Sequence, residues 1–73
     1  MATQIVMDHN GDSRYEFDPQ DPTSLAKADQ RFEELVASGF TAAVRTSSGG
    51  PIVTRKFDPT ANETLFFPRL VGG

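Results

Sequence analysis

The sequence predicts an α+β fold in which one helix covers one face of a small mixed sheet. Three observations predict it: a hairpin turn between two short strands near the start, one amphipathic stretch bounded by helix-capping residues, and three further strand-like segments. The helix is apolar along one stripe, so it is expected to cross the sheet and to cover one of its sides. Since 73 residues hold one hydrophobic core, we expect one domain over residues 1–70 and a flexible tail over 71–73.

The first two strands are expected over residues 3–8 and 13–17, joined by a turn that contains Asn10-Gly11. Asn-Gly between strands is a strong hairpin sequence, because both residues tolerate the positive φ of a tight turn. If Asn10-Gly11 is a two-residue loop, Val6 lies opposite Tyr15. The hairpin follows from the sequence, whereas its strand register stays open.

The helix is expected to begin at Pro22, with Asp21 as its N-cap, and to end before Gly39. Apolar side chains recur through it at intervals of three and four, which places them on one face. The members of this stripe are Leu25, Ala28, Phe32, Leu35 and Val36. Glycine suits the position after a helix because it takes a left-handed conformation at little cost.

Three more strands are expected over residues 40–46, 52–57 and 64–70, separated by loops rich in Gly, Ser, Pro and Asn. The expected core draws on all these elements except the strand over residues 52–57. It consists of Val6 or Ile5, Tyr15, Phe17, Leu25, Phe32, Leu35, Phe40, Val44, Leu65 and Phe67.

Composition narrows the possible functions. The formal net charge is −3, and the seven Lys and Arg residues are scattered rather than clustered, so we expect no nucleic-acid partner. The sequence has no apolar run of the roughly 20 residues that span a bilayer, and no secretory signal, so we expect no membrane partner and a cytoplasmic location.

Residues suited to catalysis are scarce. The chain has no cysteine, and its one histidine, His9, falls in the hairpin turn, where a domain of this size has little room for a pocket. Asp8, His9 and Asp12 do not follow the spacing of a metal-binding loop. We therefore expect no catalytic residue, no metal site and no cofactor bound by this chain.

The most distinctive feature is the end of the sequence, where an apolar strand passes directly into Gly72 and Gly73. Two glycines have no side chains to obstruct a narrow tunnel, and they adopt backbone angles closed to other residues. A carboxylate on Gly73 could thus reach an enzyme-bound ATP and attack its α-phosphate.

The segment over residues 62–73 resembles the C-terminal segment of the small subunit of molybdopterin synthase. Both have an acidic residue, a short apolar strand with Phe66-Phe67-Pro68 and, after the same spacing, Gly72-Gly73. Sulfur carriers of thiamine biosynthesis and ubiquitin share this plan more loosely. The chain departs from the molybdopterin group at Arg69, where proline is common, and in the double Asp-Pro loop before the helix. It is also similar to ubiquitin-like modifiers that some bacteria encode beside dedicated activating and conjugating enzymes.

The resemblance implies a ubiquitin-like β-grasp fold and activation of Gly73 by an adenylating (E1-like) enzyme that uses ATP and Mg. A conjugating (E2-like) enzyme and a peptidase that cleaves after Gly-Gly are further implied partners. Three functions remain open. The first is a protein modifier joined through Gly73 to a target amine or hydroxyl. The second is a sulfur carrier with a Gly73 thiocarboxylate, and the third is a β-grasp binding module that is never conjugated.

A partner-binding surface is expected near the tail. If Leu65 and Phe67 point into the core, strand alternation turns Phe66 outward. The surface would then consist of Phe66, Pro68, Arg69, Leu70 and Val71. The alternative is that Phe66 packs under the loop over residues 58–62.

Overall fold

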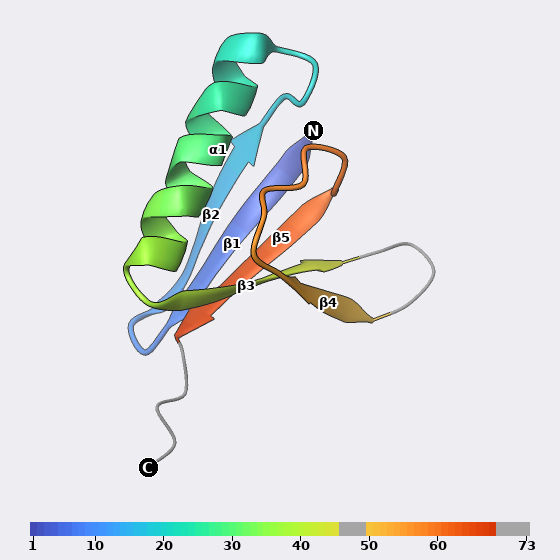
Figure 1. The fold of residues 1–73 in the computed structure, drawn as a ribbon. Coiled ribbons are helices and arrows are strands. Elements are labelled where there is room, and N and C mark those ends of the chain that lie inside the picture. Colours follow the sequence, from blue (N-terminus) through green and yellow to red (C-terminus); the bar gives the residue numbers. More distant parts are fainter. Residues whose placement is uncertain (46–49, 69–73) are drawn as a thin grey trace.

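The computed structural model describes residues 1–45 and 50–68, and it shows a mixed sheet covered on one face by a helix (Figure 1). The elements are β1 (Ala2–Asp8), β2 (Gly11–Phe17), α1 (Pro22–Ala37), β3 (Phe40–Arg45), β4 (Pro51–Thr54) and β5 (Glu63–Pro68). The sheet order is β2-β1-β5-β3-β4. β5 pairs in parallel with β1 and antiparallel with β3. The expected β-grasp fold and element order are therefore confirmed.

The first hairpin is present, but its register differs from the one that an Asn10-Gly11 loop would give. Asp8 pairs with Gly11, so the loop consists of His9 and Asn10, and Tyr15 lies opposite Gln4 rather than Val6. Gly11 carries the positive φ, at 120°. The Asp8 Oδ1 atom accepts a hydrogen bond from the Asn10 N–H at 2.8 Å, and this aspartate turn fixes where the strands separate.

The helix has the expected ends. The Asp21 side chain accepts a hydrogen bond from the Thr23 N–H at 3.2 Å, and Pro22 occupies the first turn. At the other end the backbone reverses through Gly39, whose φ is 103°. A side chain there would be strained, so glycine ends the helix and turns the chain into β3.

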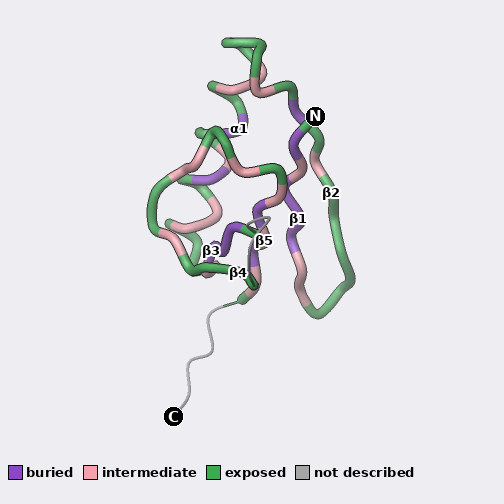
Figure 2. Tube along the Cα trace, turned by 90° about the vertical axis from the view of Figure 1, so that its right-hand side faces the viewer, coloured by how far each residue is buried: buried purple, intermediate pink, exposed green. Residues whose placement is uncertain are grey.

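The core lies between α1 and the face of the sheet that the helix covers. Figure 2 shows its buried positions along β1, β3 and β5, whereas most of β2 is exposed. The buried apolar residues on this side are Ala2, Val6, Phe17, Ala28, Phe32, Ala42, Val44 and Phe66. Most of these residues form two clusters, one around Phe32 and Phe66 and the other around Phe17 and Ala28. Phe57 joins the two clusters, because its ring lies 6.0 Å from that of Phe32 and 6.1 Å from that of Phe17.

The orientation of β5 is opposite to the one expected. Phe66 faces the helix and is fully buried, whereas Leu65 and Phe67 face away from it. The reason is pairing: β5 lies between two strands that place Val6 and Ala42 beside Phe66. Three consecutive apolar residues give no alternation to read, as is common in a central strand.

β4 is shorter than the segment over residues 52–57. Its pairing with β3 stops at Thr54. The Thr54 hydroxyl accepts a hydrogen bond from the Lys56 N–H at 3.2 Å and donates one to the Lys56 carbonyl at 2.9 Å. This turn directs Phe57 out of the sheet and into the core.

Candidate functional site

The candidate site begins where β5 leaves the sheet. β5 is the central strand, held by β1 on one side and β3 on the other, and its last residue, Pro68, lies opposite Phe40 (Figure 1). The pairing of β5 with β1 reaches Phe66 and its pairing with β3 reaches Pro68, and together they fix the position of this end. Whatever follows Pro68 in the sequence therefore starts from a well-defined point at the end of the sheet.

Most residues of the expected site follow that point. Pro68 is exposed, in keeping with a position at the strand end. The other five, Arg69, Leu70, Val71, Gly72 and Gly73, lie outside the described residues. Their roles stay predictions from the sequence.

The expected exposure of Phe66 is wrong. Its relative exposure is 0%, and its ring packs edge-on against Phe32 at a centroid distance of 5.6 Å. Phe66 therefore stabilises the contact between the sheet and the helix and cannot contact a partner directly. It lies at the centre of the core with Val6 and Ala42.

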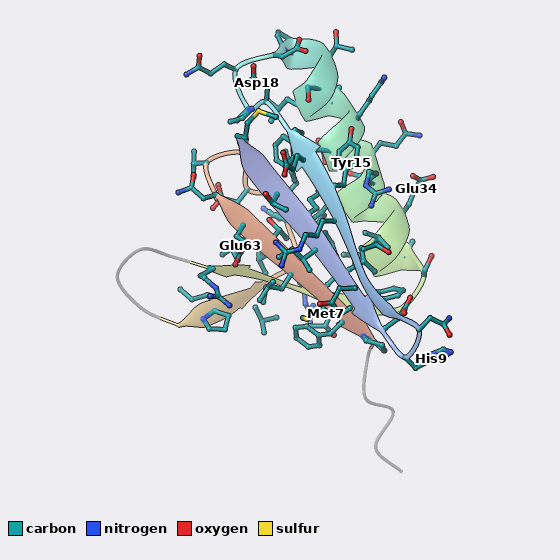
Figure 3. The ribbon with its side chains drawn as sticks, turned by 180° about the vertical axis from the view of Figure 1, so that it is seen from behind. Met7, His9, Tyr15, Asp18, Glu34 and Glu63 are labelled. Atoms are coloured by element: carbon teal, nitrogen blue, oxygen red, sulfur yellow. The ribbon has the colours of Figure 1, made fainter. Side chains whose placement is uncertain are left out.

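The structure instead presents a different apolar surface, on the face of the sheet turned away from α1, which we call the open face (Figure 3). Strand pairing and alternation place side chains from all five strands on it. They are Thr3, Ile5, Met7, Asp12, Arg14, Glu16, Thr41, Ala43, Arg45, Val53, Glu63, Leu65 and Phe67.

The middle of the open face is apolar. Leu65 lies between Ile5 on β1 and Ala43 on β3 in the register. Ile5 and Ala43 are 6% and 2% exposed although no helix covers them, because their neighbours on the sheet shield them. Met7 and Phe67 are half-buried and continue the strip toward the end of β5. The apolar strip thus reaches the end of β5, which residues 69–73 follow in the sequence.

Charged residues border this strip. The Arg45 Nε atom lies 3.1 Å from the Glu63 Oε1 atom, at the opposite end of the open face from Met7. On the other side, Arg14 and Glu16 come from β2. An apolar centre with a rim of both charges is typical of surfaces that bind other proteins.

Sequence reasoning missed Met7, Leu65 and Phe67 as surface residues. The feature that places them there is the parallel pairing of β1 with β5, which brings together segments 60 positions apart, as Thr3 pairs with Glu63. No local pattern specifies such a pairing. The loop before β5 anchors this pairing, since the Thr3 N–H donates to the Asn62 carbonyl at 2.9 Å.

The side chain of Asp58, in the loop before β5, forms hydrogen bonds within that loop. The Asp58 Oδ1 atom accepts hydrogen bonds from the Thr60 hydroxyl at 2.6 Å and from the Thr60 N–H at 2.9 Å. These bonds stabilise the carboxylate and lower the pKa of Asp58.

Within residues 1–45 and 50–68, no three His, Cys, Asp or Glu side chains converge as a metal site would require. The one helix described there is too short and too polar to cross a membrane.

No protein-family model, curated protein or solved structure matches this chain. The family likeness of its last residues accordingly stays an expectation from the sequence.

Proposed function

We propose that this chain is a ubiquitin-like protein modifier that acts through the carboxylate of Gly73. The observation that carries the proposal is the position of β5, the central strand of a β-grasp sheet, immediately before the sequence Arg-Leu-Val-Gly-Gly. In the functional form Gly73 bears a free carboxylate, either as the last residue made or after a peptidase has cut there.

The chemistry takes place on a partner enzyme. A carboxylate oxygen of Gly73 attacks the α-phosphorus of ATP, the bond to the bridging oxygen breaks, and pyrophosphate leaves with Mg. A thiol or amine then attacks the carbonyl carbon of the acyl-adenylate, loses its proton to a base and displaces AMP. This chain supplies the reacting carboxyl group and a segment thin enough to deliver it, because Gly72 and Gly73 have no side chains.

The open face supports the proposal by offering a docking surface at the right place. Its apolar strip ends at Met7 and Phe67, beside the end of β5. The five residues from 69 to 73 can span at most about 17 Å. An enzyme that binds this strip would therefore have its ATP site within reach of Gly73.

A sulfur carrier is the second candidate. The spacing from Phe66-Phe67-Pro68 to Gly72-Gly73, shared with the molybdopterin synthase small subunit, favours it. Adenylation is the same, but sulfide replaces AMP and leaves a thiocarboxylate on Gly73. The two candidates differ only in what attacks the activated carbonyl.

Exchange of labelled pyrophosphate into ATP tests the activation step that both candidates share. The purified chain, ending at Gly73, is mixed with ATP and an adenylating (E1-like) enzyme from the same source, and a chain lacking Gly72 and Gly73 serves as the control. Exchange that requires the two glycines supports activation. Mass spectrometry of the product then separates a protein adduct from a terminal sulfur. Exchange that is absent, or unchanged in the control, refutes the proposal and leaves the binding module.

A further inference from the structure

The two edges of the sheet differ in character. β2, at one edge, carries Asp12, Arg14 and Glu16 on the open face. Such charges on an edge strand discourage pairing with another strand. β4, at the other edge, has no charged side chain between Pro51 and Thr54. Its Ile52 and Val53 are 56% and 64% exposed, one on each face of the sheet. β4 is thus an open edge with apolar side chains on both faces.

A groove adjoins this edge. β4 pairs with β3 only from Ala42 to Arg45, so Phe40 and Thr41 extend beyond the end of β4. Successive residues of an antiparallel strand point their N–H and C=O groups to opposite sides, so one of these two residues points them into the groove. The groove has a volume of about 480 Å³. It is lined by Val36, Gly39, Phe40, Thr41, Ala42, Val53, Thr54 and Arg55.

The charge at this edge is positive, in a chain whose net charge is −3. Among the described lining residues Arg55 is the one with a charge, and Lys56 follows it; both are exposed. No described carboxylate forms an ion pair with Arg55. The sequence from Gly50 to Lys56 contains no acidic residue. A ligand of this edge should therefore carry carboxylates.

We propose that the open edge of β4 and the adjoining groove bind an extended acidic peptide segment of another protein by strand addition. Backbone hydrogen bonds to β4 would provide affinity, and aliphatic side chains would pack on Ile52 and Val53. A carboxylate of the peptide would pair with Arg55. A second copy of this chain fits less well, because its own β4 edge brings the same positive charges and no carboxylate. The inference does not depend on Gly73.

Fluorescence anisotropy with a labelled peptide, Glu-Thr-Val-Ile-Val-Asp-Glu, tests this inference on the whole chain. We expect saturable binding with a Kd below about 1 mM. The same peptide with lysine in place of each acidic residue should bind at least about fivefold more weakly, as should one with alternate backbone N-methylation. Because these controls change only the peptide, they do not depend on how a variant folds.

On the protein, Arg55→Glu should weaken binding at least about fivefold, whereas Arg14→Glu, the same charge change at the β2 edge, should change it less than about twofold. Amide chemical shifts should move at Ile52, Val53 and Thr41 on addition of peptide. The inference is overturned by lack of saturation, by equal binding of the lysine peptide, by equal effects of the two substitutions, or by shifts along β2. Light scattering that shows a dimer whose formation competes with the peptide would also overturn it, in favour of a second copy.

Discussion

The side-chain amide of Gln4, on β1, donates a hydrogen bond from Nε2 to the backbone carbonyl of Ala28, in the middle of α1, at 3.0 Å. Gln4 is fully buried. Its other polar atom, Oε1, accepts a hydrogen bond from Arg31 Nε at 3.3 Å. The Arg31 guanidinium in turn lies 4.6 Å from the centre of the Tyr15 ring. A satisfied polar group thus links the sheet to the helix inside a mostly apolar layer.

This link predicts that Gln4→Ala destabilises the domain by about 2 kcal/mol, since the substitution removes both hydrogen bonds and leaves a cavity. The matched control is Thr3→Ala, one position away on the open face, with an expected cost below about 1 kcal/mol. Urea unfolding measures both free energies. Equal unfolding midpoints for Gln4→Ala and the wild type would mean that the link contributes nothing.

Neighbouring phenylalanines on β5 should respond very differently to truncation. Phe66→Ala should cost about 3–5 kcal/mol, because the ring is fully buried against Phe32. A domain of this size has little more stability than that, so much of the protein should be unfolded at 25 °C. Phe67→Ala should cost about 1–2 kcal/mol, since its ring is half-buried on the open face. Circular dichroism during heating compares them, and a larger loss for Phe67→Ala would contradict the orientation of β5.

Met7, at the end of the apolar strip on the open face, should matter for activation. Met7→Glu should lower kcat/KM for pyrophosphate exchange about tenfold, through a higher KM, because it places a charge where the enzyme docks. Gln30→Glu adds the same charge on the exposed side of α1 and should leave the exchange unchanged. If both variants behave like the wild type, the open face is not the docking surface.

The loop before β5 predicts a small acid-dependent loss of stability. Hydrogen bonds from Thr60 hold the pKa of Asp58 below its value in the unfolded chain. Ionised Asp58 therefore stabilises the fold above the unfolded pKa, and that contribution is lost as the pH falls through the lower, folded pKa. Between about pH 5 and pH 3, the wild type should lose more stability than Asp58→Asn. The difference is small because the loop is exposed and solvent screens it. Parallel stability curves for the two proteins would refute this role.

Local features of the sequence predicted much of the fold. Asp21, Pro22 and Gly39 specify the helix ends through their own backbone preferences, and the structure places them as expected. The strand register in the hairpin, which the sequence leaves open, differs by two residues from that of an Asn10-Gly11 loop. Asn10 and Gly11 permit more than one tight turn, and the aspartate turn at Asp8 selects between them.

Contacts between distant segments could not be predicted in this way. The faces of β5 depend on its pairing with β1 and β3, and three successive apolar side chains conceal that choice. The sequence predicts Phe57 as the last residue of a strand over residues 52–57, yet the structure packs its ring between Phe17 and Phe32. The Gly72-Gly73 motif of the candidate site is local and could be recognised from the sequence. The open face beside it is formed by the pairing of distant strands, so it could be recognised only from the structure.

The most direct test of the central claim is to look for the tail attached to other proteins in the source cells. Trypsin cleaves after Arg69, so a conjugated lysine would retain a Leu-Val-Gly-Gly branch joined through the Gly73 carbonyl. We predict that mass spectrometry detects this branch on target peptides, and that cells producing the chain without Gly72 and Gly73 lack it. Recovery of the chain with only a free or sulfur-bearing Gly73 carboxyl group, and no branched peptide, would contradict the modifier function.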